Sequence, residues 1–171
     1  MIVSGEKIVL KPITKEHTGL IVKWRNNQEV RRNFIFQETF TEEIHNNWMD
    51  TKVATGDVVQ FVIYTKEDDI PIGSVYLRDV DKHHEKAEFG IFIGEDIARG
   101  KGYGTEATKL ICKYGIEELG LHKIILRVFA FNKSAIAAYE KAGFVKEAYF
   151  KDDVKIDGKF EDMIFMALID N

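Results

Sequence analysis

Glycines occupy every second position in the segment Arg99-Gly100-Lys101-Gly102-Tyr103-Gly104-Thr105. Glycine lets the backbone approach a ligand closely, because it has no Cβ. Apolar residues recur at helical spacing from Ala107 to Tyr114, so we expect a helix to begin where this loop ends. The free N–H groups and the dipole at a helix start favour a phosphate, and Arg99 and Lys101 add positive charge. The pattern therefore predicts a phosphate-binding loop.

Two common phosphate-binding patterns do not fit this loop. A dinucleotide fingerprint, G-x-G-x-x-G, needs a third glycine where this chain has Thr105. A P-loop needs Ser or Thr after its Gly-Lys pair, whereas Lys101 is followed by Gly102. A tight strand-to-helix turn without a ligand also contains short glycine motifs. The loop needs support from the rest of the chain.

Other reactive residue types carry less information. Cys112 lies in the middle of the predicted helix between Ile111 and Lys113, so we expect it to pack rather than to act as a nucleophile. The pair His83-His84 lacks further ligands at metal-binding spacing, and no metal is expected. Trp24 and Trp48 are expected in the core or in a pocket wall. The pair Arg31-Arg32 either contacts an anionic substrate or is solvated.

The apolar periodicity predicts the elements that hold the loop. Strands are expected at residues 7–12, 60–64, 72–77, 87–93, 123–129, 144–156 and 159–169, and helices after caps at Thr14 and Thr39, after the glycine loop, and from Asn132 to Gly143. The last two strands flank Asp157-Gly158, a strong two-residue hairpin signal. The glycine loop thus follows a strand directly and opens a helix.

Composition places the chain among globular proteins. Its 171 residues, 45% of them hydrophobic, fit one domain, residues 1–171. The net charge of −4 comes from interspersed charges, which argues against nucleic-acid binding and weakly suits a cationic substrate. A single cysteine excludes an internal disulfide, and no uninterrupted apolar run of about 18 residues offers a membrane span. No signal peptide is recognisable, so we expect a cytoplasmic protein.

Two blocks of this sequence carry a family resemblance. The pattern Arg99-x-x-Gly102-x-Gly104 after strand 87–93, and the segment 132–144 (Asn-Lys-Ser-Ala-Ile-Ala-Ala-Tyr-Glu-Lys-Ala-Gly-Phe), together resemble the GNAT-type N-acetyltransferases. The order of elements is similar throughout. The resemblance implies a single GNAT-like α/β (α+β) domain with a mixed, mostly antiparallel central sheet flanked by helices. It also implies direct transfer of an acetyl group from acetyl-CoA to a primary amine.

Shorter segments resemble particular branches of that superfamily. Residues 7–12 and 156–162 are similar to ribosomal-protein N-terminal acetyltransferases, and spermidine acetyltransferases share that pattern. Lys23-Trp24-Arg25-Asn26 resembles an early motif of enzymes that acetylate amino-sugar nucleotides. The acceptor therefore stays open among an amino-sugar nucleotide, a polyamine and a protein N-terminus. A non-catalytic coenzyme A sensor or interaction domain is the alternative, and the exposed edges of an open sheet favour a homodimer.

The resemblance also implies a position for acetyl-CoA. Its pantetheine would pair like an extra strand with Ile91 and Ile93, and Asn132, with Ser134 beside it at the helix start, would contact the pantetheine arm. Either Lys133 or Lys141 would reach the adenosine phosphate. The diphosphate would lie on the backbone amides of Arg99, Gly100, Lys101, Gly102, Tyr103, Gly104 and Thr105.

The chemistry of acetyl transfer requires three groups. The attacking amine must lose a proton, and Glu88 is the candidate base, although it could instead face outward or bind a cationic substrate. A strand N–H near Ile91 to Ile93 would stabilise the negative charge on the acetyl oxygen. Tyr139 matches the superfamily's general-acid tyrosine and would protonate the departing thiolate. Its position on an apolar face is also typical of a core aromatic.

Overall fold

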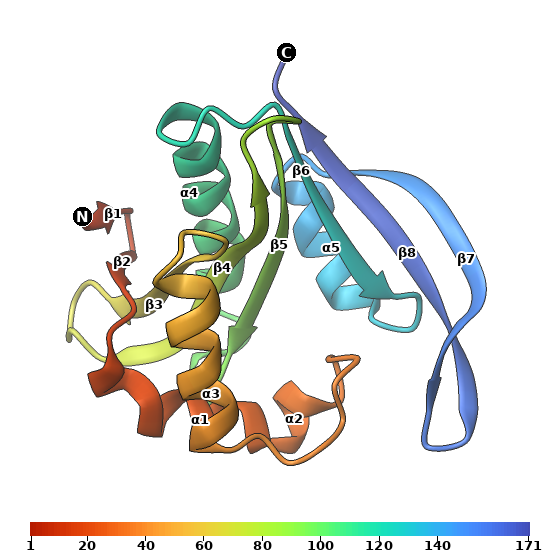
Figure 1. Cartoon of the computed structure of the whole chain (residues 1–171), viewed down its shortest axis with the longest axis horizontal. Helices are drawn as coiled ribbons and strands as arrows, with labels where there is room; N and C mark the ends of the chain where they lie inside the picture. The colour runs from red at the N-terminus through yellow and green to blue at the C-terminus, as the bar shows by residue number, and fades with distance from the viewer.

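Eight strands form one sheet in the computed structural model, which describes residues 1–171 (Figure 1). Their spatial order is β1-β2-β3-β4-β5-β6-β8-β7, and every neighbouring pair is antiparallel except β5 and β6. The strands are β1 (Val3–Ser4), β2 (Ile8–Pro12), β3 (Val59–Thr65), β4 (Pro71–Asp81), β5 (Lys86–Ile93), β6 (Lys123–Phe129), β7 (Val145–Ile156) and β8 (Lys159–Ile169). The expected mixed, mostly antiparallel sheet is confirmed.

The parallel pair β5 and β6 is short. Only Lys86–Glu88 of β5 pairs with Lys123–Ile125 of β6. Beyond these residues the two strands diverge, and in Figure 1 they separate from the upper toward the lower part of the molecule. The sheet is therefore divided into a β1–β5 half and a β6–β8–β7 half, with a gap between them.

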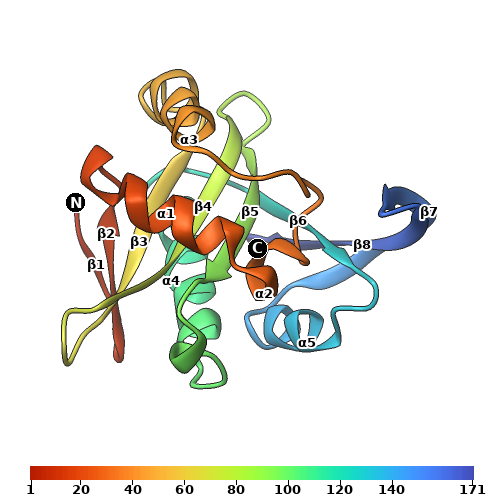
Figure 2. The same ribbon diagram turned by 90° about the horizontal axis from the view of Figure 1, so that it is seen from below.

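Helices cover both faces of the sheet. They are α1 (Thr18–Asn26), α2 (Gln28–Arg31), α3 (Glu42–Trp48), α4 (Tyr103–Glu117) and α5 (Lys133–Lys141), with short helical turns at Lys15–His17, Met49–Val53 and Asp96–Ala98. Figure 2 shows α1 and α3 on one side of the β1–β5 half and α4 on the other. Helix α5 packs next to α4.

The alternation of side chains along the strands creates two hydrophobic cores. In β4, Val75 and Leu77 pack toward α4, whereas Tyr76 between them packs with Trp24 of α1 and Phe92 of β5. Residues 72–77 of β4 are thus buried on both faces, which explains why all of them except Ser74 are apolar or glycine. Burying one such side chain stabilises the fold by roughly 1.5–3 kcal/mol.

Most predicted elements are found where the sequence placed them. The hairpin between β7 and β8 turns at Asp157 and Gly158, which have φ angles of 48° and 80°, as a type I′ turn requires. Helix α5 begins after Asn132 and Gly143 follows its end with φ 104°. Strand β1 and helix α2 were not predicted. None of the helices combines the length and apolar sequence needed to cross a bilayer.

The predicted cap at Thr39 is wrong, because helix α3 is capped by Thr41. The Thr41 side chain accepts a hydrogen bond from the Ile44 N–H at 3.2 Å. The Asn26 side chain binds both backbone groups of Phe40, with its Oδ1 accepting from the N–H at 2.8 Å and its Nδ2 donating to the carbonyl at 2.7 Å. Helix α1 thereby holds Phe40 outside the helix, so α3 begins two residues later than the pattern indicates.

A substitution at Gly94, directly after β5, can test how closely α1 packs against the sheet. A Cβ added there would lie 2.0 Å from Cγ of Trp24, which is fully buried. We expect Gly94→Ala to lower the free energy of unfolding by about 1–3 kcal/mol, measured by urea denaturation. Gly19→Ala in α1 is the matched control, because no atom lies within 4 Å of its added Cβ. The control should be neutral or stabilising by up to about 1 kcal/mol, and equal effects of both changes would contradict this packing.

Candidate active site

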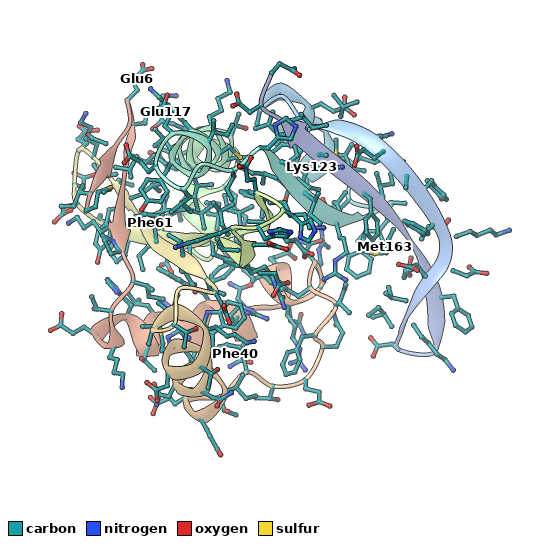
Figure 3. All side chains as sticks on the ribbon, turned by 45° about the horizontal axis from the view of Figure 1, so that its top comes forward. Glu6, Phe40, Phe61, Glu117, Lys123 and Met163 are labelled. Carbon is teal, nitrogen blue, oxygen red and sulfur yellow. The ribbon has the colours of Figure 1, made fainter.

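The gap between β5 and β6 opens into a cavity of about 1030 Å³. This volume is at the upper end of ordinary ligand sites and suits a large ligand or two ligands. Phe40, from the segment between α2 and α3, and Met163, from β8, lie on different walls of this region (Figure 3). Residues predicted for the site that line the cavity are Glu88, Ile91, Ile93, Arg99, Gly100, Gly102, Tyr103, Gly104, Thr105, Asn132, Ser134 and Tyr139.

The open edge of β5 forms one wall of the cavity. The Gly94 N–H donates to the Ile72 carbonyl of the neighbouring chain segment at 2.7 Å. Because backbone groups in an antiparallel pair alternate in direction, those of Ile91 and Ile93 point away from β4 and toward the gap. The Ile93 carbonyl accepts hydrogen bonds from Arg99. The Ile91 N–H and carbonyl and the Ile93 N–H are left to pair with an extended ligand.

The glycine loop forms the start of α4. Gly100 and Gly102 have φ angles of 75° and 82°, a region that glycine adopts without strain, and Gly102 is the N-cap. The first hydrogen bond of the helix runs from the Glu106 N–H to the Gly102 carbonyl at 3.1 Å. The amides of Tyr103, Gly104 and Thr105 therefore have no helical acceptor and lie at the cavity. This arrangement fits a phosphate.

The two basic side chains of the loop differ from expectation. Arg99 donates from Nη2 and Nε to the Ile93 carbonyl at 2.8 and 3.2 Å, and from Nη1 to Asp96. The hydrogen bond from Arg99, with a second one from Asn27, holds the pKa of Asp96 below its usual value. The Arg99 charge thus fastens the loop to the end of β5 instead of standing free for a ligand. Lys101 lies outside the cavity, beside a smaller hollow lined by Glu6 and Lys7.

The start of α5 lies at the rim of the cavity. The Asn132 Oδ1 accepts from the Ala135 N–H at 3.3 Å and from the Ser134 hydroxyl at 3.4 Å, so it caps the helix. The Asn132 Nδ2 donates to Oδ1 of Asn33 at 3.2 Å. Asn132 therefore connects α5 to the segment that follows α2, across the gap in the sheet.

Tyr139 of α5 lies under the gap. Its ring packs edge-on against Phe89 of β5, with centroids 5.6 Å apart, and is tilted against Phe144, with centroids 6.1 Å apart. Its hydroxyl donates to no protein group, and the residue lines the cavity. Burial raises the pKa of Tyr139 above its usual value of about 10, so the phenol is protonated at neutral pH. In that form it can donate a hydrogen bond or a proton.

Glu88 is the last residue of β5 that pairs with β6, and the gap between the two strands begins after it. Its Oε2 accepts hydrogen bonds from Nη2 and Nε of Arg127 at 3.1 and 3.2 Å. Its cross-strand neighbour in β4 is Arg78. The carboxylate therefore has a cationic partner in the protein, while its Oε1 accepts no hydrogen bond from the chain.

Aromatic side chains line the half of the cavity near α1 and α3. We call this half the acceptor half, and the residues that line it include Arg25, Phe34, Phe40, His45, Trp48, Tyr76 and Arg78. Tyr76 lies across Gly90 of the adjacent strand, because a Cβ at Gly90 would come within 2.3 Å of its ring. Trp48 packs edge-on against Tyr76 with centroids 6.0 Å apart. The Trp48 Nε1 donates to Gln60 at 2.8 Å, and Gln60 in turn donates to the Ser74 hydroxyl at 2.9 Å. These hydrogen bonds hold the cavity wall in place. Trp48 is thus a wall residue. Trp24 is fully buried and is a core residue.

Polar residues of the acceptor half were missed by sequence reasoning about the site. Arg25 appeared only within a branch motif, and His45 and Arg78 gave no signal. His45 reads as part of a polar helix surface, yet it is 1% exposed and lines the cavity. Burial and the charge of Arg25 lower the pKa of His45, so the imidazole is neutral at pH 7. The fold brings these three residues together from α1, α3 and β4.

Cys112 and the histidine pair lie away from this cavity. Cys112 is part of the core beneath α4, and burial raises its pKa to about 12. A thiol in that state is not a nucleophile at neutral pH, which agrees with the expected packing role. His83 and His84 lie in the turn between β4 and β5, where Nδ1 of His84 is 2.9 Å from Oδ2 of Asp81.

Comparison with known proteins agrees with this geometry. The model of the acetyltransferase (GNAT) domain family matches residues 7–145. Spermidine N(1)-acetyltransferase of Escherichia coli K12 is 30% identical over 166 residues, which cover 96% of this chain and 87% of that protein. The Vibrio cholerae enzyme of the same name is 26% identical, covering 96% of this chain and 94% of that protein.

Solved structures have the same fold. The crystal structure of spermidine N-acetyltransferase from Vibrio cholerae in complex with CoA and spermine superposes with a TM-score of 0.89 at 24% identity, over 96% of each chain. A GNAT-family acetyltransferase from Bacillus anthracis gives a TM-score of 0.83 at 22% identity, covering 99% of this chain and 98% of that chain. The chain belongs to the GNAT acetyltransferases. It is an N-acetyltransferase that uses acetyl-CoA as its cosubstrate.

The position of Cys112 leads to a prediction about how the acetyl group moves. Because the only cysteine is buried in the core, we expect that transfer does not pass through an acetylated cysteine. We expect Cys112→Ala to retain kcat for the acceptor within about twofold while losing roughly 1 kcal/mol of stability. Loss of turnover in a variant that still binds acetyl-CoA would contradict direct transfer. A thiol reagent such as DTNB should react with the native protein only after denaturant is added.

Proposed function

We propose that this enzyme acetylates the primary amine of a small molecule by direct attack on acetyl-CoA in the cavity between β5 and β6. One juxtaposition carries the proposal. The unpaired amides at the start of α4, the open edge of β5 and the unpartnered hydroxyl of Tyr139 all line one cavity. We propose that residues 1–171 act as a single acetyltransferase domain.

Each part of acetyl-CoA has a matching surface in this proposal. The amides of Tyr103, Gly104 and Thr105 hold the diphosphate, and the free backbone groups of Ile91 and Ile93 pair with the pantetheine. Asn132 contacts the same arm from α5. Acetyl-CoA supplies the thioester whose carbonyl carbon the amine attacks. Bound in this way, the thioester lies in the gap, close to the point where β5 and β6 diverge.

Groups of the protein then transfer protons and stabilise the negative charge that develops on the acetyl oxygen. We propose that the free Oε1 of Glu88 accepts a hydrogen bond from the acceptor amine and takes its proton as the C–N bond forms. A free strand N–H at Ile91 or Ile93 donates to the acetyl oxygen while it carries negative charge. Tyr139 gives its proton to the sulfur as the C–S bond breaks. Glu88 then releases its proton to solvent, and the Tyr139 phenolate takes one from solvent, so both groups return to their starting states.

The names of the relatives suggest acceptor classes to test. Several relatives are spermidine acetyltransferases, so a polyamine is one class of small amine for this enzyme. Amino-sugar nucleotides and peptides with free N-termini are the others. A coenzyme A sensor would need none of them and would not depend on the Tyr139 hydroxyl.

Self-association is a further part of the proposal. The edge strand β7 exposes Val145 and Tyr149, and Phe160 of β8 is 59% exposed. A Vibrio cholerae relative is described as dodecameric, with a TM-score of 0.79 at 26% identity, over 96% of this chain and 95% of that chain. We propose that copies of this chain associate through this side of the sheet, to be measured by light scattering after size-exclusion chromatography.

The Tyr139 hydroxyl decides between catalysis and sensing. We expect Tyr139→Phe to lower kcat by about 10²-fold or more, because general acid catalysis contributes roughly 10²–10⁴-fold, and to leave the Kd for acetyl-CoA unchanged. The measurement is release of coenzyme A with a polyamine, an amino-sugar nucleotide and a peptide with a free N-terminus as acceptors. Tyr114→Phe is the control, since Tyr114 packs on Phe61 outside the cavity. Full turnover in Tyr139→Phe would remove the general-acid assignment.

A further inference from the structure

The acceptor half contains a partly buried cation, Arg25, without an acid partner. The Arg25 guanidinium lies over the faces of Phe34 and Phe40, 3.9 and 4.4 Å from the ring centroids. No carboxylate forms an ion pair with it, and it donates no hydrogen bond to any protein group. The two aromatic faces hold the cation but leave its N–H groups at the edge of the guanidinium free.

Two further nitrogen atoms in the same cavity lack a hydrogen-bond partner. Nε2 of His45 is buried and unpartnered, in a side chain that is almost fully inaccessible. Nε of Arg78 is also buried without a hydrogen bond, although Oδ2 of the exposed Asp79 lies 3.4 Å away. Buried polar groups in proteins nearly always have a partner. Unpartnered nitrogens from α1, α3 and β4 around one cavity, two of them arginine donors, indicate an oxygen-bearing group that comes with a ligand.

The acidic side chains that line the cavity do not serve as partners for these unpaired nitrogens. Glu88 pairs with Arg127, and Glu29 lies 3.7 Å from Arg32. No other carboxylate lines the cavity. A polyamine, with several positive charges, would meet Arg25 without a neutralising group. The net charge of −4 suggested a cationic substrate, but the local charge around the acceptor half is positive.

We propose that the acceptor carries an oxyanion, a carboxylate or a phosphate, in addition to its reacting amine, and that Arg25 binds it together with Arg78 and His45. This inference rests on the proposed function. The planar guanidinium presents two parallel N–H groups, which match two oxygens of either anion. The neutral His45 imidazole adds one donor when its proton is on Nε2. Arg25 then selects acceptors by charge, while the aromatic walls contact the rest of the molecule.

The test compares amine acceptors that differ in charge. Coenzyme A release is measured for spermidine, for a neutral amino sugar, for the same sugar as its phosphate or nucleotide, and for dipeptides with and without a C-terminal amide. We expect the phosphate-bearing or carboxylate-bearing member of a pair to have a kcat/KM about 10–100-fold above its neutral partner. The phosphate and carboxylate pairs show which anion is bound.

Variants of Arg25 identify the group responsible. Arg25→Met keeps an apolar stem on Phe34 and Phe40 but removes the charge, and it should abolish that preference mainly by raising KM for the anionic acceptor. KM for acetyl-CoA should not change. Arg32→Met is the matched control, because Arg32 is exposed and outside the cavity. If Arg25→Met does not fold, Arg78→Met is tested in the same way and should weaken the preference.

The outcomes separate this inference from the proposed function. Spermidine acetylated as well as or better than every anionic acceptor would overturn the oxyanion subsite and leave the acetyltransferase proposal intact. An unchanged preference in the folded Arg25→Met variant would also overturn it. Absence of turnover with all amines, while acetyl-CoA still binds, would overturn the proposed function and this inference with it.

Discussion

The site depends on the interruption of pairing between β5 and β6. A continuous sheet would satisfy the backbone groups of both strands, and buried backbone groups without partners are costly. Here the pair ends after three residues, and the Tyr139 and Phe144 rings pack against Phe89 below the gap. The backbone groups of Ile91 stay unpaired beside the free amides of α4. A ligand that is extended and carries phosphates, such as acetyl-CoA, can satisfy both sets at once.

Two glycines near the gap let aromatic side chains pack closely against β5. Without a side chain at Gly90, the Tyr76 ring lies across the strand and reaches the cavity. Without one at Gly94, Trp24 packs directly on the backbone, and its Nε1 donates to Glu95 at 2.6 Å. Helix α1 is thereby anchored to the end of β5. The same helix carries Arg25, so packing in the core determines where that charge lies.

Charge is distributed unevenly in this molecule. The chain as a whole is acidic, and most of its ion pairs are exposed and contribute little to stability, about 0–1 kcal/mol each. The cavity wall instead collects arginines from α1, β4 and β6. Arg127 has Glu88 as a partner, whereas Arg25 is surrounded by aromatic rings. Net charge therefore describes solubility and long-range attraction, and the charge of the site follows from which side chains the fold buries together.

The sequence alone determined the order along the chain of every strand and helix except β1 and α2, together with the glycine loop before α4, the Asp157-Gly158 turn and the start of α5 after Asn132. These features depend on local periodicity and on backbone conformations that few residues adopt. The tertiary structure decided the rest. Contacts between distant segments moved the cap of α3 to Thr41, attached Arg99 to Ile93 and Asp96, and gathered Arg25, His45 and Arg78 around one cavity. Periodicity indicates which face of an element is buried, but it carries no information on which buried polar groups will meet.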